Sequence, residues 1–289
     1  MLKTVRLTEQ FQSQQGAAML LGGFDGLHVG HRQLLSCAKA SGFPVGLMTI
    51  VGGKEENSLF TFAEREEIFR EAGADFVFEL PFAEIKDLSP QAFLRLLEEE
   101  FSPNLYVCGE DFRFGAKAVG TPKLLKESTH VRVETLSLVQ MDGEKVSSSR
   151  IKSLLENGEV GAVNDLLTHP FFVMGEVYAD RKIGRTIGFP TANIRYPKGK
   201  YPLKIGVYET RVCVDGRTYK GITNYGARPT FADETVVTET YLDGFSGDLY
   251  GKTLRVEFIR RLRGVVKFDS VDALQKQLMK DIERVKTND

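Results

Sequence analysis

Few cysteines, little net charge and no long apolar run characterise this sequence of 289 residues. Its three cysteines, Cys37, Cys108 and Cys213, are too scattered for a metal site, which predicts free thiols in a reducing compartment. The net charge of −1 provides no overall basic field for binding nucleic acid. No apolar run approaches the ~18 residues of a membrane-spanning helix, and the N-terminus has no signal-peptide pattern. We therefore expect a cytoplasmic protein without nucleic-acid or membrane partners.

The composition and the length indicate what is present instead. Hydrophobic residues make up 42% of the chain and charged residues 27%, which is typical of a globular protein. A chain of this length can form two domains, each with its own core.

The stretch Gly22–His31 (GGFDGLHVGH) is the most informative part of the first half. It follows an apolar run, Ala17–Leu21, which we predict to be a buried strand, and precedes a predicted helix that ends near Gly42. The free amides at a helix N-terminus attract phosphate. His28 and His31 are three residues apart and share one face of that helix. Their rings can donate hydrogen bonds to a phosphate whose charge rises during transfer.

Strands and helices alternate through the rest of the first half. Predicted strands cover Val45–Val51, Phe76–Leu80, Leu105–Cys108 and part of Val131–Val139. Predicted helices cover Thr61–Ala72 and the segment from Pro90 to Phe101, with Ser89 as N-cap. This alternation predicts a parallel sheet, with ligands beyond the carboxyl ends of its strands.

Two more polar stretches follow strands and fall at the same predicted edge. One is Gly109–Gly115 (GEDFRFG), whose Phe112 and Phe114 fit either the core or a binding site. The other is Val146–Lys152 (VSSSRIK), whose hydroxyls can either cap a helix or bind phosphate.

These stretches, in this order, resemble the adenylyltransferase half of the bacterial bifunctional riboflavin kinase/FMN adenylyltransferase (FAD synthetase) family. The resemblance implies that His28 and His31 stabilise the transition state of adenylyl transfer from ATP to FMN. It implies that the ATP phosphates are bound by Gly22, Phe24, Gly30, Ser148, Ser149 and Lys152. It also implies that Asp111 and Phe112 contact flavin or adenine.

The sequence departs from the family pattern at two places. Lys152 stands where the family usually has arginine, so the charge is kept but the bidentate fork is lost. Ile50–Lys54 replaces a Phe-Asp-Pro-His-Pro run. These departures keep an alternative open, which is a riboflavin kinase with weak or lost FAD synthesis.

The composition changes after His169–Pro170. Short segments rich in β-branched and aromatic residues follow, with Asp215–Gly216 as a hairpin turn. The predicted strands are Phe171–Tyr178, Ile205–Val214, Arg217–Ile222, Val236–Leu242 and Thr253–Ile259. They indicate an antiparallel barrel, followed by a helix over Val271–Val285 whose apolar face packs on the barrel.

The stretch Ile183–Asn193 (IGRTIGFPTAN) carries the chemistry of this half. Its glycines allow a loop to wrap phosphates, and Thr191 and Asn193 offer oxygen ligands suited to Mg²⁺. It resembles the riboflavin kinase signature. This resemblance implies that Glu239 is the catalytic base and that Arg263 contacts flavin. It implies that ATP is bound by Gly184, Arg185, Thr186 and Gly188.

The sequence thus predicts an α/β nucleotidyltransferase domain with a Rossmann-like parallel sheet over residues 1–168. An antiparallel β-barrel riboflavin kinase domain with a C-terminal helix is expected over 169–289. The implied substrates are riboflavin, FMN and ATP, with Mg²⁺ as the metal. A non-catalytic flavin- or nucleotide-binding regulator is a second alternative. An adenylyl- or cytidylyltransferase for another phosphate would explain only the first half.

Overall fold

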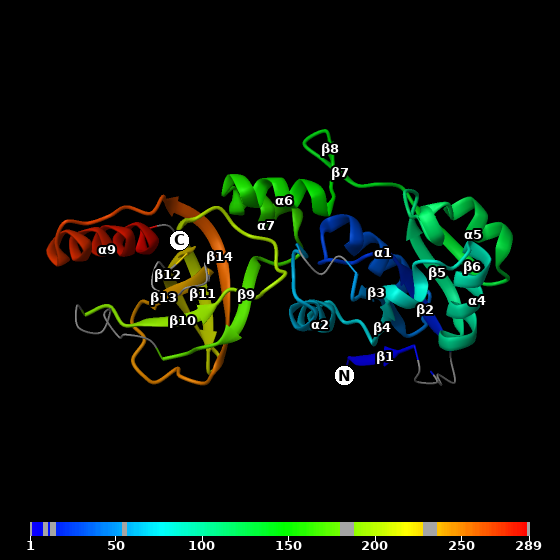
Figure 1. Ribbon diagram of the computed structural model, residues 1–289, viewed down its shortest axis with the longest axis horizontal. Helices are drawn as coiled ribbons and strands as arrows, with labels where there is room; N and C mark the ends of the chain where they lie inside the picture. Colours follow the sequence, from blue (N-terminus) through cyan, green and yellow to red (C-terminus); the bar gives the residue numbers. More distant parts are fainter. Residues whose placement is uncertain are drawn as a thin grey trace. The chain divides into compact units, whose positions relative to one another are not determined.

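The computed structural model describes residues 2–7, 11, 16–53, 57–179, 188–227 and 236–287. The chain divides into two compact units, Met1–Arg150 and Ile151–Asp289 (Figure 1). The boundary expected after residue 168 falls inside the second unit. The helices that precede it are α6 (Ser148–Asn157) and α7 (Val160–Leu166), and α7 contacts strands of the second unit.

A six-stranded parallel sheet forms the first unit, in the order β1-β4-β3-β2-β5-β6. Its strands are β1 (Lys3–Arg6), β2 (Ala17–Leu21), β3 (Val45–Val51), β4 (Phe76–Pro81), β5 (Pro103–Gly109) and β6 (Arg132–Leu136). The predicted parallel sheet is confirmed, whereas β1 was not predicted because it is short and buries only Val5. The chain continues from β2 to one side of the sheet and returns with β5 on the other. This reversal opens a crevice at the carboxyl ends of β2 and β5.

Most helices of this unit begin at a residue whose side chain caps them. They are α1 (Val29–Ala40), α2 (Phe62–Glu71), α3 (Phe82–Ile85), α4 (Pro90–Phe101) and α5 (Pro122–Ser128), with a 3₁₀ turn at Ala116–Ala118. Thr61 and Glu64 form a reciprocal capping box at α2. The Ser89 hydroxyl accepts from the Ala92 amide at 3.1 Å, and Pro90 occupies the first helical position as predicted. The core between sheet and helices includes Met19, Phe78 and Phe101, all fully buried.

A six-stranded antiparallel sheet forms the second unit, in the order β10-β13-β12-β11-β14-β9. Its strands are β9 (Phe171–Glu176), β10 (Thr191–Arg195), β11 (Gly206–Val214), β12 (Arg217–Ala227), β13 (Val236–Leu242) and β14 (Thr253–Arg263). The edges β9 and β10 meet through the Tyr178 amide, which donates to the Asn193 carbonyl at 3.0 Å. The predicted antiparallel barrel is thereby confirmed, although β10 was not among the predicted strands.

Turns and hydroxyl groups fix the register of this barrel. Asp215 and Gly216 have φ of +50° and +80°, the geometry of the predicted two-residue hairpin turn. Inside the barrel, the Thr210 and Thr223 hydroxyls are 2.8 Å apart, and the Thr223 and Thr240 hydroxyls are 2.9 Å apart. These cross-strand bonds satisfy polar groups that are buried in the barrel.

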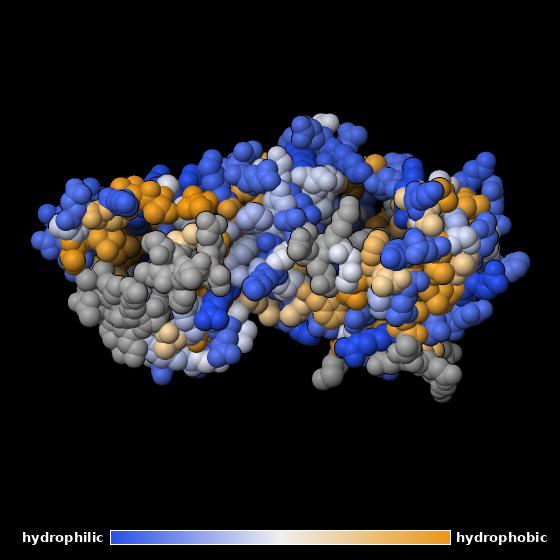
Figure 2. Space-filling model, in the orientation of Figure 1, coloured by the Kyte–Doolittle hydropathy of each residue, from blue (hydrophilic) through white to orange (hydrophobic). Residues whose placement is uncertain are grey.

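The C-terminal helix α9 (Val271–Lys286) packs on the barrel through only part of its apolar face. Val285 is buried and Ile282 is partly buried against Val207 and Ile222. The prediction that the whole face packs is wrong for Val271, which is 56% exposed. Figure 2 shows hydrophobic side chains gathered over α9 and the loop before it.

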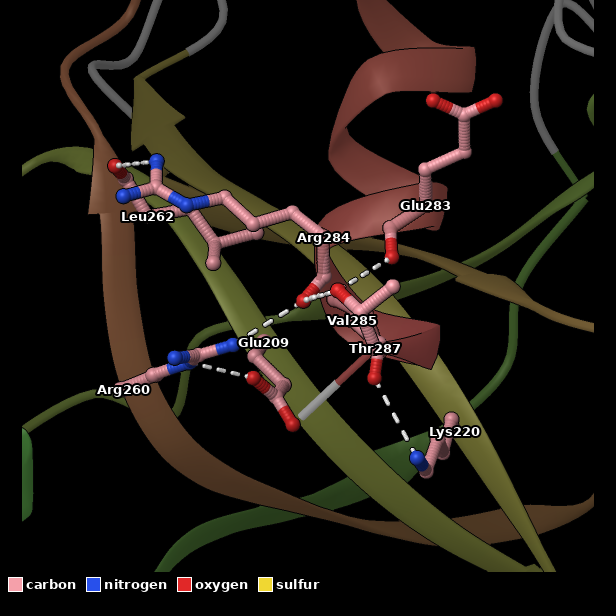
Figure 3. A network of polar contacts seen from close by, with 8 residues as sticks. All are labelled: Glu209, Lys220, Arg260, Leu262, Glu283, Arg284, Val285 and Thr287. Atoms are coloured by element: carbon pink, nitrogen blue, oxygen red, sulfur yellow. Dashed lines mark hydrogen bonds and ion pairs between the residues drawn. The ribbon is translucent and has the colours of Figure 1, made fainter. Parts of the chain in front are cut away.

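Basic side chains hold the last turn of α9 against the strands (Figure 3). Arg260 donates to the Arg284 carbonyl and Lys220 to the Val285 carbonyl, both at 3.2 Å. Arg284 in turn donates to the Leu262 carbonyl at 3.3 Å. Cations at a helix C-terminus satisfy free carbonyls and complement the helix dipole. These contacts attach the C-terminal end of the helix, whereas Val271 at the opposite end is exposed. Among the described residues, no helix combines the length and the apolar character required to cross a membrane.

A buried ion pair attaches the middle of α9. Arg263 donates from Nε and Nη2 to Asp281 Oδ2 at 2.9 and 2.7 Å. Gln277 donates to the other carboxylate oxygen at 2.9 Å. The Asp281 side chain is 4% exposed, so its charge depends on these donors.

We expect the substitution Asp281→Asn to lower the free energy of unfolding of the second unit by about 3 kcal/mol, because it leaves the Arg263 cation without its buried counter-charge. Urea unfolding followed by circular dichroism measures this loss. Glu127→Gln, in an exposed pair with Lys123, is the matched control and should change stability by less than about 0.5 kcal/mol. Equal effects of the two substitutions would contradict the stabilising role of the buried pair.

Candidate functional site

A cavity of about 640 Å³ lies in the first unit, at the carboxyl ends of β2 and β5. Gly22 directly follows β2 and Gly109 ends β5, so the crevice predicted from the strand order is where the cavity is found. The predicted site residues that line it are Gly22, Phe24, His28, Gly30, His31, Asp111, Phe112 and Ser148. The fold therefore brings together residues from three separate sequence motifs.

His28 caps the N-terminus of α1 with its side chain. Its Nδ1 accepts a hydrogen bond from the His31 amide at 3.2 Å, and its backbone is extended, as an N-cap requires. A ring nitrogen that accepts carries no proton, so the neutral imidazole carries its proton on Nε2. His28 lines the cavity and so offers a donor to a bound phosphate.

His31 carries its ring proton on the other nitrogen, Nδ1. Its Nδ1 lies 2.9 Å from the Gly26 carbonyl, which can only accept, so the ring proton resides on Nδ1. The two imidazoles stack with centroids 3.5 Å apart, and Phe24 contacts the His31 ring at 4.7 Å. Phe24 has a φ of +22°, a rare backbone conformation for a residue with a side chain. The expectation that both rings donate to phosphate fits neutral His28, and fits His31 only once it gains a proton.

Burial keeps both rings neutral. It lowers the pKa of His28 to about 4, whereas a hydrogen bond to the backbone of His28 itself and the charge of Asp111 oppose this, and Lys145 lowers the pKa further. Burial and the neighbouring His28 also hold the pKa of His31 well below its ordinary value. An anionic ligand would reverse this effect, because negative charge close to an imidazole favours its charged form.

The serine stretch contributes to the helix cap and to the cavity. Ser147 caps α6 by accepting from the Arg150 amide at 3.3 Å, and both Ser147 and Ser148 line the cavity. Ser149 is exposed and lies outside the lining. Lys152 also lies outside the lining, with its ammonium 5.2 Å from the centre of the Tyr201 ring.

Basic residues that were not among the predicted site residues also line the cavity. They are Lys86, Arg113, Lys117 and Lys145, all exposed, and Lys145 forms an ion pair with Asp111. Ile50, from the stretch that departs from the family pattern, lines it as well. Apart from Arg113 and Lys117, which both follow β5, these residues come from segments far apart in the sequence, so no local spacing could have identified them as one group.

In the second unit, Glu239 on β13 lies between two asparagines. The strand register places it directly opposite Asn193 of β10 and Asn224 of β12. The Asn224 amide donates to Glu239 Oε2 at 3.4 Å. Thr191 lies opposite Tyr241, two positions further along the same pair of strands. Sequence reasoning missed Asn224 as a site residue, because only the register brings it beside Glu239.

The remaining predicted residues of this half are placed as follows. Gly188 is exposed with a φ of +80°, whereas Gly184, Arg185 and Thr186 lie outside the described residues. Arg263 is engaged with Asp281, although the register puts it opposite Val207 and so in the same cross-strand row as Asn224. Within the described part of the chain, no cluster of three or more His, Cys, Asp or Glu could hold a metal.

Each half of the chain matches a model of a known protein family. A family model described as FAD synthetase matches residues 10–150, and one described as riboflavin kinase matches residues 167–288. A bifunctional riboflavin kinase/FMN adenylyltransferase of Bacillus subtilis is 30% identical, with 97% of this chain and 96% of that protein covered. The protein of the same description from Haemophilus influenzae is 32% identical over 94% of each chain. A crystal structure described as a macrolide-efflux protein from Streptococcus pneumoniae has a TM-score of 0.90, 28% identity and 99% coverage of both chains.

We expect His28 to titrate near pH 4 in the free protein, because burial disfavours the charged ring and lowers its pKa. Tripolyphosphate should move this titration to higher pH. NMR of imidazole-labelled protein measures both, with the His28→Asn variant to assign the resonance. A midpoint above pH 6 without ligand would refute the geometry described above.

The lowered pKa of His28 also makes the folded chain less stable at acidic pH. The folded pKa lies below the ordinary value of 6.5, so the contribution of neutral His28 is complete above pH 6.5. This contribution is lost as the pH falls from 6.5 towards 4, because the unfolded chain takes up a proton on His28 in this range and the folded chain does not.

Proposed function

The chain belongs to the family of bifunctional riboflavin kinase/FMN adenylyltransferases, and we propose that it makes both flavin cofactors in two ATP-dependent steps. The second unit phosphorylates riboflavin to FMN. The first unit transfers the adenylyl group of ATP to FMN, which gives FAD and pyrophosphate. The observation that carries this proposal is that each family model covers a part of the chain with its own polar site.

The geometry of the first unit suits adenylyl transfer. The phosphate of FMN attacks the α-phosphorus of ATP, and pyrophosphate leaves without any covalent intermediate on the protein. The Nε2 proton of His28 and the free amides of α1 stabilise the charge that develops on the transferred phosphate. The exposed cations that line the cavity, with Lys145 closest to Asp111, neutralise the remaining phosphate charge.

The geometry of the second unit suits phosphoryl transfer to a hydroxyl. Glu239 accepts the proton of the riboflavin 5′-hydroxyl as this hydroxyl attacks the γ-phosphorus of ATP, and ADP leaves. The Asn224 amide orients this carboxylate through Oε2. Thr191 and Asn193 present hydroxyl and amide oxygens beside it, a donor set that fits Mg²⁺. When bound there, Mg²⁺ would neutralise charge on the ATP phosphates.

The proposal places the protein in the cytoplasm, with riboflavin, FMN and ATP as substrates. Product chromatography tests it directly. Purified protein is incubated with riboflavin, excess ATP and Mg²⁺, and the flavins are separated. We expect both FMN and FAD. FMN alone would favour the kinase with a silent first unit, and neither product would favour the flavin-binding regulator.

Substitutions in the two sites should separate the two activities. His28→Asn can still cap α1 but removes the ring donor, so FAD formation should fall about 100-fold or more while FMN formation is unchanged. Glu239→Gln should reduce FMN formation by about 100-fold or more, while FAD formation from supplied FMN persists.

The matched controls are His130→Asn and Glu176→Gln, both at exposed positions, and neither should alter either rate by more than about twofold. Loss of both activities from a single site substitution, in a protein that remains folded, would refute the assignment of one reaction to each unit.

A further inference from the structure

The segment 137–148 forms one wall of the cavity in the first unit, with Val139, Lys145 and Ser148 among its lining residues. Its middle is a hairpin of β7 (Gln140–Met141) and β8 (Glu144–Lys145), joined by a two-residue turn. The hairpin forms a sheet of its own with only two pairs of residues in register. A ribbon this short is not stable by itself in water. Contacts from elsewhere must therefore hold this wall in place.

Arg150, in the first turn of α6, supplies several of these contacts. Its Nη1 donates to the Met141 carbonyl at 2.8 Å and to the Glu144 carbonyl at 3.3 Å, so one guanidinium bridges both strands. Its Nε lies 3.1 Å from the Glu144 carboxylate, and its Nη2 lies 3.5 Å from that of Asp142. The Arg150 side chain is only 19% exposed and does not line the cavity.

The carbonyl bonds matter more than the ion pairs. The side chains of Asp142 and Glu144 are 85% and 71% exposed, and pairs so exposed contribute little. The two carbonyls, in contrast, belong to the backbone of the hairpin, and both accept from Nη1, which the planar guanidinium holds in place. A lysine nitrogen would stand at the position of the guanidinium carbon, one bond short of Nη1, on a flexible stem.

The segment 137–148 also contacts the residues that follow β5 and the start of α1. Lys145 pairs with Asp111, and the Leu138 amide donates to Glu110 at 3.0 Å. Val139 lies close to Gly30, in the first turn of α1, since a Cβ placed on that glycine would be 3.7 Å from Val139 Cβ. A shift of the hairpin would therefore move Lys145 and Val139 relative to His28.

We propose that Arg150 is a positioning residue for the transfer reaction of the first unit. It fixes the hairpin to the start of α6, so that Lys145 and Ser148 face the triphosphate while Val139 closes the cavity beside His28. Arg150 touches neither substrate and acts through this wall. The inference rests on the proposed adenylyl transfer.

The test compares Arg150→Met with Arg150→Lys in the full chain. Arg150→Met keeps most of the aliphatic stem but removes the guanidinium donors, so kcat/KM for ATP in FAD formation should fall about 10- to 100-fold. Arg150→Lys restores the charge, but its nitrogen ends one bond short of the Nη1 position, and it should recover only a small part of the loss. FMN formation by the same protein is the internal control and should stay within about twofold of wild type.

Two further measurements separate positioning from charge and from unfolding. Amide hydrogen exchange over residues 140–146 should be about tenfold faster or more in Arg150→Met, with β2 and α1 unchanged. The double variant Asp142→Asn/Glu144→Gln is the matched control, because it removes the exposed pairs and keeps the carbonyl bonds. It should leave both exchange and FAD formation close to wild type.

Full activity of Arg150→Lys would overturn the proposal, because charge alone would then suffice. Faster exchange with unchanged FAD kinetics, or an equal loss of FMN and FAD formation, would overturn it as well. Absence of FAD from the wild-type reaction would overturn the proposed function, and this role with it. FAD formation by the wild type with unaltered kinetics in Arg150→Met would overturn the role of Arg150 alone.

Discussion

The first unit depends on one hydrogen bond, from the His31 amide to the ring of His28. It starts helix α1 at the carboxyl end of β2, where the strand order opens a crevice. It also fixes the tautomer of His28, so that the free donor is the nitrogen that does not cap the helix. An ordinary cap residue such as serine would start the helix equally well but would leave no ring donor for a phosphate. The side chain of His28 thus both starts helix α1 and provides a hydrogen-bond donor for a phosphate.

In this cavity the buried histidine rings are neutral, and the positive charge lies on exposed side chains around them. Both imidazoles are neutral in the free protein, because a charged ring would lose its hydration without compensation. Positive charge is carried instead by the exposed residues Lys86, Arg113, Lys117 and Lys145, which stay hydrated. An arriving polyphosphate meets these cations and, once bound, favours protonation of the rings. The site is therefore arranged to gain charge only when an anion is present.

The second unit obtains its site from strand register. Antiparallel pairing aligns Asn193, Glu239 and Asn224 across three strands, so that a carboxylate, an amide donor and oxygen ligands share one face. The rigid barrel fixes their spacing through its backbone and through the threonine hydroxyls inside it. Helix α9 adds to this face, where Arg263 and Asp281 pair, and its last carbonyls are satisfied by Arg260 and Lys220.

The sequence by itself determined the alternating first half, the strand-rich second half, the caps at Thr61 and Ser89 and the turn at Asp215–Gly216, because these depend on local periodicity and on single residues. It also indicated His28, His31 and Glu239, whose motifs are contiguous. Only the tertiary structure decided that Ser147 and Ser148 line the cavity while Ser149 does not, that Asn224 lies beside Glu239, and that Lys145 reaches Asp111. It also decided that Val271 is exposed and that Arg150 bridges the hairpin. Those features arise from pairings between segments distant in sequence, and such pairings are set by packing and register, which no local pattern encodes.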